Sequence, residues 1–149
     1  MYAVDDVTKQ GLAALPNLAT QTVTTNGNIS LLNNAEATIT GAYSVSGTNG
    51  SAVTQFHFNC VLSNYFDVVS GYVINGSMTI SGTETAVPSA SNGSTLTFTE
   101  LGILSATGGQ TLSLDPTLTY NLTQSAVFTG TRTGTITVNG TVYDASQTL

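Results

Sequence analysis

Residues 111–122 read TLSLDPTLTYNL, with an apolar residue, proline or tyrosine at every even position and a polar residue at every odd position. Successive side chains of an extended strand point to opposite faces, so this pattern collects the apolar residues on one face and the hydroxyl-bearing residues on the other. A helix, with 3.6 residues per turn, would not separate the two sets. The stretch therefore predicts antiparallel β-structure with one buried and one solvated face.

The alternation extends in both directions from this stretch. Downstream it keeps the same parity to Val142, and upstream it recurs between residues 37 and 45, 54 and 62, and 72 and 80. Residues 72–78 (YVINGSM) also share their pattern of apolar, polar and Asn-Gly positions with residues 136–142 (ITVNGTV). Two similar halves of three or four strands each predict an all-β fold, either an antiparallel β-sandwich or a closed β-barrel of about eight strands.

Two local irregularities are expected in this pattern. The apolar parity runs straight through Asn75-Gly76 and Asn139-Gly140, which predicts a bulge or a bent strand at each of them in place of a tight two-residue turn. The parity also changes between Phe98 and Leu101, which predicts a β-bulge near Glu100.

The N-terminal region contains the one helix that the sequence predicts, from Asp5 to Leu15, capped by Asp5 and ended by Pro16. From Asn17 to Ser30 the chain is rich in threonine and weakly patterned. We therefore divide the chain into residues 1–30, a helix and a loose segment that could be donated as a strand to a neighbour, and residues 31–149, a single β domain.

The composition excludes several classes of partner. Only 7% of the 149 residues are charged, the formal net charge is −6, and Ser and Thr together number 42. With two basic residues the chain has no patch that could neutralise phosphates, so nucleic-acid binding is excluded. No run of about 18 apolar residues predicts a transmembrane helix. The uncharged, hydroxyl-rich composition favours an extracellular or cell-surface location, and because the N-terminus does not read as a signal peptide, we expect an exported form to be processed.

Residues that could support catalysis or metal binding are few, and no motif connects them. His57 lies between Phe56 and Phe58 and should point to the solvated face as an ordinary exposed or cross-strand histidine. The acidic residues have no spacing that would pair two of them for catalysis, and we expect them in solvated loops or at strand ends; they are Asp67, Glu84, Glu100, Asp115 and Asp144. No metal-ligand pattern and no cofactor motif is present, so the sequence predicts no enzyme, no metal site and no cofactor.

Three further side chains have two interpretations each. Cys60, the single cysteine, is either a buried inert thiol, or the source of an intermolecular disulfide or a reactive thiol. Tyr65 and Phe66 follow the second clear strand, where they either fill the core or form an exposed contact patch.

Residues 56–60 (FHFNC) and 71–82 (GYVINGSMTISG) together resemble uncharacterised bacterial secreted or lipoprotein-like β-domains that are rich in threonine and serine. The resemblance implies export and a β fold, and it implies no activity. No cysteine near the N-terminus could carry a lipid anchor.

Three functional hypotheses follow. The first is a structural or surface protein that self-associates through β-strand edges into a filament, pilus-like or matrix assembly. The second is an adhesin-like β module that binds a glycan or a host surface through loops near Tyr65, Phe66 and residues 83–94. The third is a small outer-membrane β-barrel, which the length of the chain permits.

Overall fold

The structure is a computed structural model that describes residues 2–15, 25–33, 36–47, 52–86, 94–114, 119–124 and 128–148. It contains one helix, α1 (Tyr2–Ala13), and eleven strands. The strands are β1 (Thr25–Asn33), β2 (Ala37–Ser46), β3 (Val53–Asp67), β4 (Tyr72–Ala86), β5 (Ser94–Ala106), β6 (Gln110–Leu114), β7 (Thr119–Gln124), β8 (Phe128–Thr133), β9 (Thr135–Val138), β10 (Thr141–Asp144) and β11 (Gln147–Thr148).

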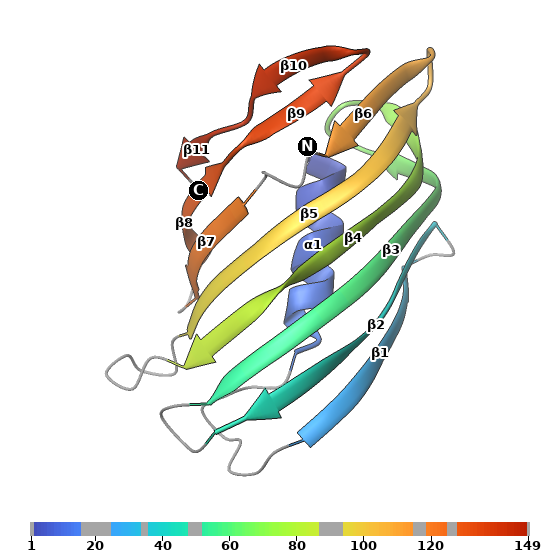
Figure 1. Ribbon diagram of the computed structural model, residues 1–149. Helices are drawn as coiled ribbons and strands as arrows, with labels where there is room; N and C mark the ends of the chain where they lie inside the picture. Colours follow the sequence, from blue (N-terminus) through green and yellow to red (C-terminus); the bar gives the residue numbers. More distant parts are fainter. Residues whose placement is uncertain are drawn as a thin grey trace.

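All eleven strands belong to one antiparallel sheet (Figure 1). Strands β1 to β5 pair in chain order, and β5 then pairs with β6 along residues 102–106 and with β7 along residues 94–99. Strand β9 pairs with β6 and β10, whereas β8 pairs with β7 and β11. Strands β1 to β5 each occupy one position across the sheet. Each of the next three positions holds two strands end to end, which are β6 with β7, β9 with β8, and β10 with β11. The sheet therefore has eight positions, and the chain direction alternates from one to the next.

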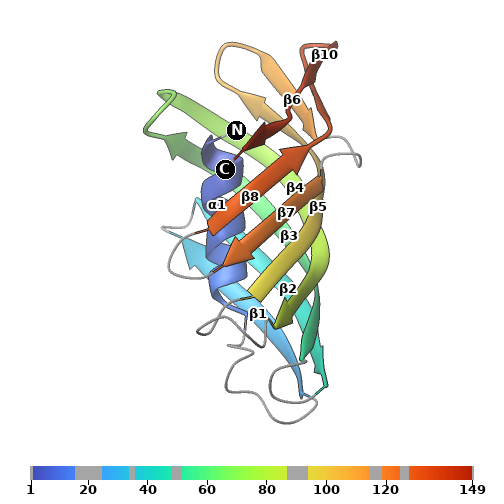
Figure 2. The ribbon, with the colours of Figure 1, turned by 90° about the vertical axis from the view of Figure 1, so that its left-hand side faces the viewer.

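The sheet is curved, and α1 runs along its concave face (Figures 1 and 2). The predicted all-β antiparallel fold with one short N-terminal helix is confirmed. The described strands form an open sheet: the path begins at β1 and ends at β10, and these two strands do not pair with each other. The predicted boundary between residues 30 and 31 falls within β1, which pairs with β2 of the same chain, and residues 16–24 lie outside the described residues.

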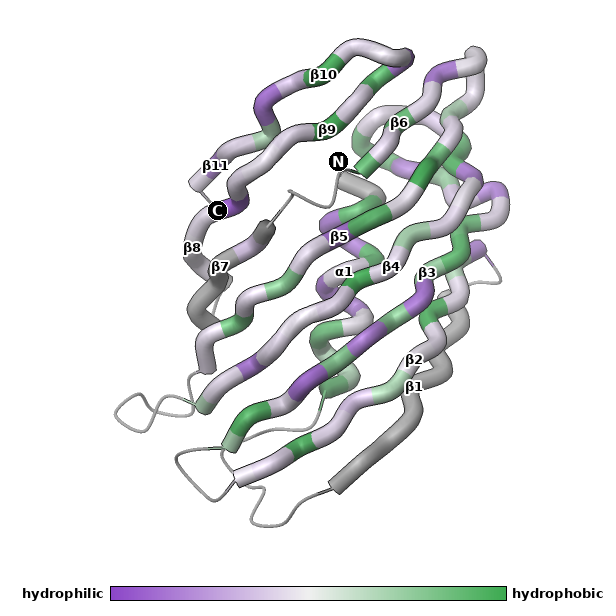
Figure 3. The backbone as a smooth tube through the Cα atoms, viewed as in Figure 1, coloured by the Kyte–Doolittle hydropathy of each residue, from purple (hydrophilic) through white to green (hydrophobic). Residues whose placement is uncertain are grey.

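Alternating burial explains why these segments form strands. In β3 the even residues from Thr54 to Leu62 are buried, and the odd residues between them are exposed. Most of the exposed positions of the sheet carry Thr, Ser or Asn, so the strands in Figure 3 are largely pale, with hydrophobic residues in green interspersed among them. Threonine suits these positions because its branched side chain favours the pleated backbone while its hydroxyl group is hydrated.

Helix α1 is amphipathic and shares one hydrophobic core with the sheet. Val4, Val7 and Leu12 are buried in that core, whereas Asp6 and Lys9 are exposed. Gly11 allows the helix to approach the sheet closely, because a Cβ atom at this position would lie 3.2 Å from the Phe58 ring. The helix begins earlier than the sequence predicted, so Asp5 lies within its first turn and is not its cap.

Glycines on the concave face make room for large side chains on the neighbouring strands. Gly41 pairs with Phe58, and Gly82 pairs with Phe98. A Cβ atom on Gly41 would lie 2.8 Å from the Cα atom of Phe58, and one on Gly82 would lie 2.7 Å from the Cα atom of Phe98. The absence of a side chain at these positions therefore lets the sheet curve around its own aromatic core.

The prediction that the strand continues through each Asn-Gly pair is correct at Asn75-Gly76 and wrong at Asn139-Gly140. Asn75-Gly76 lies inside β4, which continues through it. Asn139-Gly140 forms a tight turn between β9 and β10, in which Val138 pairs with Thr141 and both turn residues have positive φ (50° and 81°). These dihedral angles are typical of a type I′ hairpin turn, and as a consequence Val142 points to the solvent and is 64% exposed.

The β-bulge predicted near Glu100 is also absent, because β5 pairs with β4 without a register shift. Glu100 is therefore fully buried, whereas Leu101 and Ile103 lie on the convex face with exposed fractions of 50% and 67%. A bulge occurs in β3 instead, between Leu62 and Tyr65, where Asn64 adopts a positive φ of 55°.

Candidate functional site

The bulge in β3 separates the two residues of the predicted contact patch. Tyr65 turns inward, belongs to the hydrophobic core and donates a hydrogen bond from its hydroxyl group to Asp6 Oδ2 at 2.6 Å. Phe66 points outward and is 51% exposed. Of the loop that was predicted to join these residues in ligand binding, residues 87–93 lie outside the described residues.

His57 and Cys60 lie on opposite faces of β3. His57 is exposed on the convex face, where its Nδ1 atom lies 2.6 Å from Ser81 Oγ across the strands, as predicted for a cross-strand histidine. Cys60 is a buried free thiol. Burial is the main cause that raises the pKa of this thiol to about 12, and the nearby charge of Glu100 adds to the rise. A thiol with such a pKa is almost never a thiolate at neutral pH, so Cys60 is a poor nucleophile.

The acidic residues are more buried than the sequence predicted. Asp67 and Glu84 are each 6% exposed and Glu100 is 0% exposed, so none of these three is solvated, although Asp67 is the last residue of β3 and so lies at a strand end, as predicted. The prediction of a solvated acid is correct for Asp144, which is exposed, and Asp115 lies outside the described residues. Each buried carboxyl group accepts a hydrogen bond from a serine or threonine hydroxyl group; the pairs are Ser70 with Asp67, Ser94 with Glu84, and Thr8 with Glu100.

Glu100 is the centre of a polar cluster between α1 and the sheet. The Thr8 hydroxyl group donates to Glu100 Oε1 at 2.5 Å, and the Tyr120 hydroxyl group donates to Oε2 at 3.0 Å. The same tyrosine oxygen lies 3.4 Å from Asp5 Oδ1, and Arg132 Nη1 lies 3.4 Å from that carboxylate oxygen. The cluster therefore joins the helix to β5, β7 and β8.

Arg132 extends this cluster to the C-terminal strand. Its Nε atom donates to the carbonyl oxygen of Ala145 at 2.9 Å, and its Nη2 atom donates to Gln147 Oε1 at 2.8 Å. Its guanidinium carbon lies 5.8 Å from the centre of the Tyr120 ring, within the range of a cation–π contact. Arg132 therefore connects the start of α1 to β11.

Burial dominates the electrostatics of the cluster. It raises the pKa of Glu100 to about 7, against the hydrogen bonds from Thr8 and Tyr120, while the negative charge of Asp5 adds to the rise and Arg132 reduces it. Burial also raises the pKa of Asp5, although the Arg132 guanidinium lowers it. The Tyr120 hydroxyl group has one proton, but the carboxyl groups of Glu100 and Asp5 both lie within its reach. It cannot donate a hydrogen bond to both, so the cluster is more stable with Glu100 protonated than with two ionised acids.

The chemistry of the cluster suits anchoring and not catalysis. Glu100 exposes no surface, and Tyr120 and Arg132 are 3% and 5% exposed, so a reactant cannot reach the carboxyl group in this conformation. The sequence did contain a signal for the cluster: Glu100 shares the even parity of Leu96 and Phe98, which places all three side chains on the concave face. The signal was missed because a buried glutamate is rare unless it is paired.

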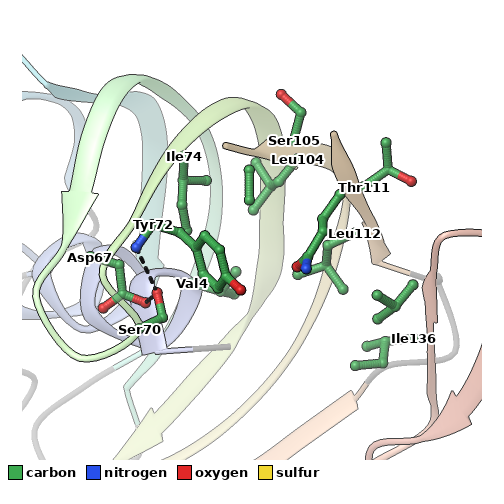
Figure 4. A pocket seen from close by; sticks show the side chains of 13 residues that line it. Val4, Asp67, Ser70, Tyr72, Ile74, Leu104, Ser105, Thr111, Leu112 and Ile136 are labelled. Atoms are coloured by element: carbon green, nitrogen blue, oxygen red, sulfur yellow. Dashed lines mark hydrogen bonds between the residues drawn. The ribbon is translucent and has the colours of Figure 1, made fainter. Parts of the chain in front are cut away.

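A cavity of about 250 Å³ lies at the end of the sheet where α1 begins (Figure 4). We call this the hairpin end, because it carries the β3–β4 turn (68–71), the β5–β6 turn (107–109) and the β9–β10 turn (139–140), as Figure 1 shows. Side chains from α1, β4, β5, β6 and β9 line the cavity, and they include Val4, Ile74, Leu104, Leu112, Ile136 and Val138. Asp67 and Ser70 form its polar side.

Large apolar side chains are exposed around the hairpin end and on the convex face. Val68 and Val69, in the β3–β4 turn, are 81% and 62% exposed. On the convex face, Val61, Leu101 and Ile103 line a shallow groove. These residues interrupt a surface that is otherwise rich in threonine and serine.

The structure offers few other sites. Within the described ranges, no group of three or more His, Cys, Asp or Glu side chains could hold a metal ion. No helix in the described part of the chain is long and apolar enough to span a membrane. No protein-family model matches the chain, and no curated protein and no solved structure is significantly similar to it.

Proposed function

We propose that the protein is an extracellular structural subunit that self-associates edge to edge, with β1 of one copy pairing with β10 of the next. The observation that carries the proposal is the open sheet, whose path ends at these two strands. Unpaired strand edges present a row of free N–H and C=O groups and readily pair with another chain.

In the described part of the chain, β1 carries none of the sequence and backbone features that usually protect an edge strand. Its nine residues, TNGNISLLN, include no charged residue and no proline. Its ladder with β2 runs from Thr25 to Asn33 without a register shift, so no bulge twists the edge away. Natural sheets usually protect an edge of this length with lysine, proline or a bulge.

The opposite edge is compatible with β1. All four residues of β10 are exposed, and Val142 and Tyr143 present apolar surface with exposed fractions of 64% and 51%. Every neighbouring pair along the path from β1 to β10 is antiparallel, so β10 runs antiparallel to β1. A junction between copies would therefore continue the antiparallel order. Because it joins two different edges, it would produce rings or filaments.

The low charge of the chain supports an extracellular structural role, because a formal charge of −6 spread over 149 residues opposes close packing of copies only weakly. The glycan-binding alternative has less support. Of its two predicted aromatic contacts, Tyr65 lies in the core and only Phe66 is exposed.

Val142→Lys should weaken self-association by at least about tenfold, because it replaces exposed apolar surface on the β10 edge strand with a charge, and lysine on an edge strand discourages pairing with another chain. Light scattering across a concentration series would give the size distribution, and electron microscopy would show filaments or rings. Val61→Lys is the matched control: Val61 is 49% exposed, but it lies on β3, which has a partner on both sides. A wild-type protein that stays monomeric throughout, or weakening by Val61→Lys alone, would contradict the proposal.

A further inference from the structure

The cavity at the hairpin end has the size and lining of a small-molecule site. Its volume is about 250 Å³, and its walls come from six different elements of the fold. An apolar cavity of about 150 Å³ suffices to bind benzene, so by proportion this one holds about ten non-hydrogen atoms. Figure 4 shows the Tyr72 ring lying between the Asp67–Ser70 side and Leu112. Tyr72 is 39% exposed, so the cavity reaches the surface there.

Asp67 and Ser70, on the polar side of the wall, are already engaged in hydrogen bonds. Asp67 Oδ1 accepts a hydrogen bond from the backbone N–H of Val69 at 3.0 Å, and its Oδ2 accepts one from Ser70 Oγ at 2.7 Å. The backbone N–H of Thr111 donates to Asn139 Oδ1 at 2.8 Å. A charged ligand would therefore lose hydration with little compensation, and an anion would also be repelled by the Asp67 carboxylate.

The turn beside the cavity is unusually apolar. Turn positions normally carry Gly, Pro, Asn, Asp or Ser, because these residues satisfy the backbone of a turn or adopt its dihedral angles. Here Val68 and Val69 occupy the β3–β4 turn and are largely exposed, next to Ser70 and Tyr72, which line the cavity. These two valines do little for the core, and they lie in the same turn as Ser70, beside the cavity.

We propose that the hairpin-end cavity binds one neutral, apolar molecule of the size of a bicyclic aromatic ring. The aliphatic side chains of Val4, Leu104, Leu112 and Ile136 contact the ring system, and Val68 and Val69 cover its exposed side. The site is separate from the strand edges of the proposed assembly, so either inference can fail without the other.

Indole is a suitable probe, because the chain contains no tryptophan and indole emission can be read against a background of tyrosine only. We expect saturable one-to-one binding of indole, and binding of indole-3-acetate, which adds a negative charge to the same ring, weaker by at least about tenfold. Light scattering on the same samples would report self-association separately.

Val138→Phe should weaken indole binding by at least about tenfold, because the added ring occupies the cavity. Thr137→Phe is the matched control: it adds the same ring one residue earlier on β9, where the side chain points to the other face, and it should change the affinity by less than about twofold. Equal binding to the two variants, or binding that does not saturate, would overturn the proposal.

Amide chemical shifts of the wild-type protein provide a second measurement that holds even if Val138→Phe does not fold. Indole should perturb the amides of Ile74, Leu104 and Leu112. Perturbation confined to Val61, Leu101 and Ile103, in the groove on the convex face, would overturn the proposal.

Discussion

Gly82→Val should lower the free energy of unfolding by about 3 kcal/mol or more, the upper end of the usual cost of overpacking. Gly82 lies on the concave face of β4, between Phe56 on β3 and Phe98 on β5. A Cβ atom there would overlap the carbonyl oxygen of Thr97 and the Cβ atom of Phe98. Backbone and Cβ atoms cannot rotate away, so the strands themselves would have to separate.

Thermal and denaturant unfolding would measure this loss, which corresponds to a melting temperature roughly 6 to 12 °C lower for a domain of this size. Thr83→Val is the matched control, because Thr83 is the next residue on β4, points to the convex face and is isosteric with valine. It should change the stability by less than about 0.5 kcal/mol. If Gly82→Val cost no more than this control, the aromatic core would not be packed against β4 as the structure has it.

The alternation of apolar and hydroxyl-bearing residues was sufficient to predict most of the strands, although not β1 in the weakly patterned N-terminal segment, because the side-chain period of a strand is independent of the partners it finds. It predicted that Phe56, Phe58 and Cys60 share one buried face, and it predicted His57 on the opposite face, which is what the structure has. The pattern could not predict that a helix and a curved sheet would share the core, because curvature depends on which glycine pairs with which aromatic residue.

The two Asn-Gly pairs mark the limit of local inference. Asn75-Gly76 and Asn139-Gly140 have nearly the same neighbours in the sequence, but one lies in a continuous strand and the other forms a hairpin turn. Gly76 pairs with Leu62 on β3 and with Leu104 on β5, so partners on both sides keep β4 extended there. The later pair has a partner on one side only, where Asn139 exchanges hydrogen bonds with Thr111 of β6, and the intrinsic preference of Asn-Gly for a type I′ turn prevails.

The limit of inference from local sequence also explains why the contact patch and the burial of the acids were not predicted correctly. The bulge at Asn64 turns Tyr65 inward and Phe66 outward, and the sequence around it contains no signal for that shift. The prediction that the acids are solvated followed from the cost of burying a charge. Glu100 reduces this cost by staying protonated up to about pH 7 and by hydrogen bonds from Thr8 and Tyr120, which lie 92 and 20 residues away in the sequence.

The stability of the protein should depend on pH through Glu100. Its pKa is about 7 in the folded protein, above its ordinary value of 4.5. Between these two values an unfolded chain has lost the proton while the folded protein still binds it, so the free energy of unfolding falls as pH rises, by about 1.4 kcal/mol per unit. The contribution is fully present below pH 4.5 and lost above pH 7, for a total of roughly 3 kcal/mol.

Glu100→Gln tests this directly, because glutamine has the shape of the protonated acid and can hydrogen-bond to Thr8 and Tyr120 without a charge. The variant should match the wild type near pH 4.5 and exceed its stability by up to roughly 3 kcal/mol above pH 7. The groups that face Glu100 and could alter this value are Asp5 on α1, Cys60 on β3, Tyr120 on β7 and Arg132 on β8.

Asp144→Asn is the control for this experiment. Asp144 is exposed, and its hydrogen bonds from Ser146 lower its pKa, so its titration lies below the window and the pH dependence between 4.5 and 7 should not change. Urea denaturation at several pH values would give the free energies for all three proteins. If Glu100→Gln were less stable than the wild type at every pH, the ionised carboxylate would be the form that holds α1 against the sheet, and Arg132 would be its necessary counter-charge.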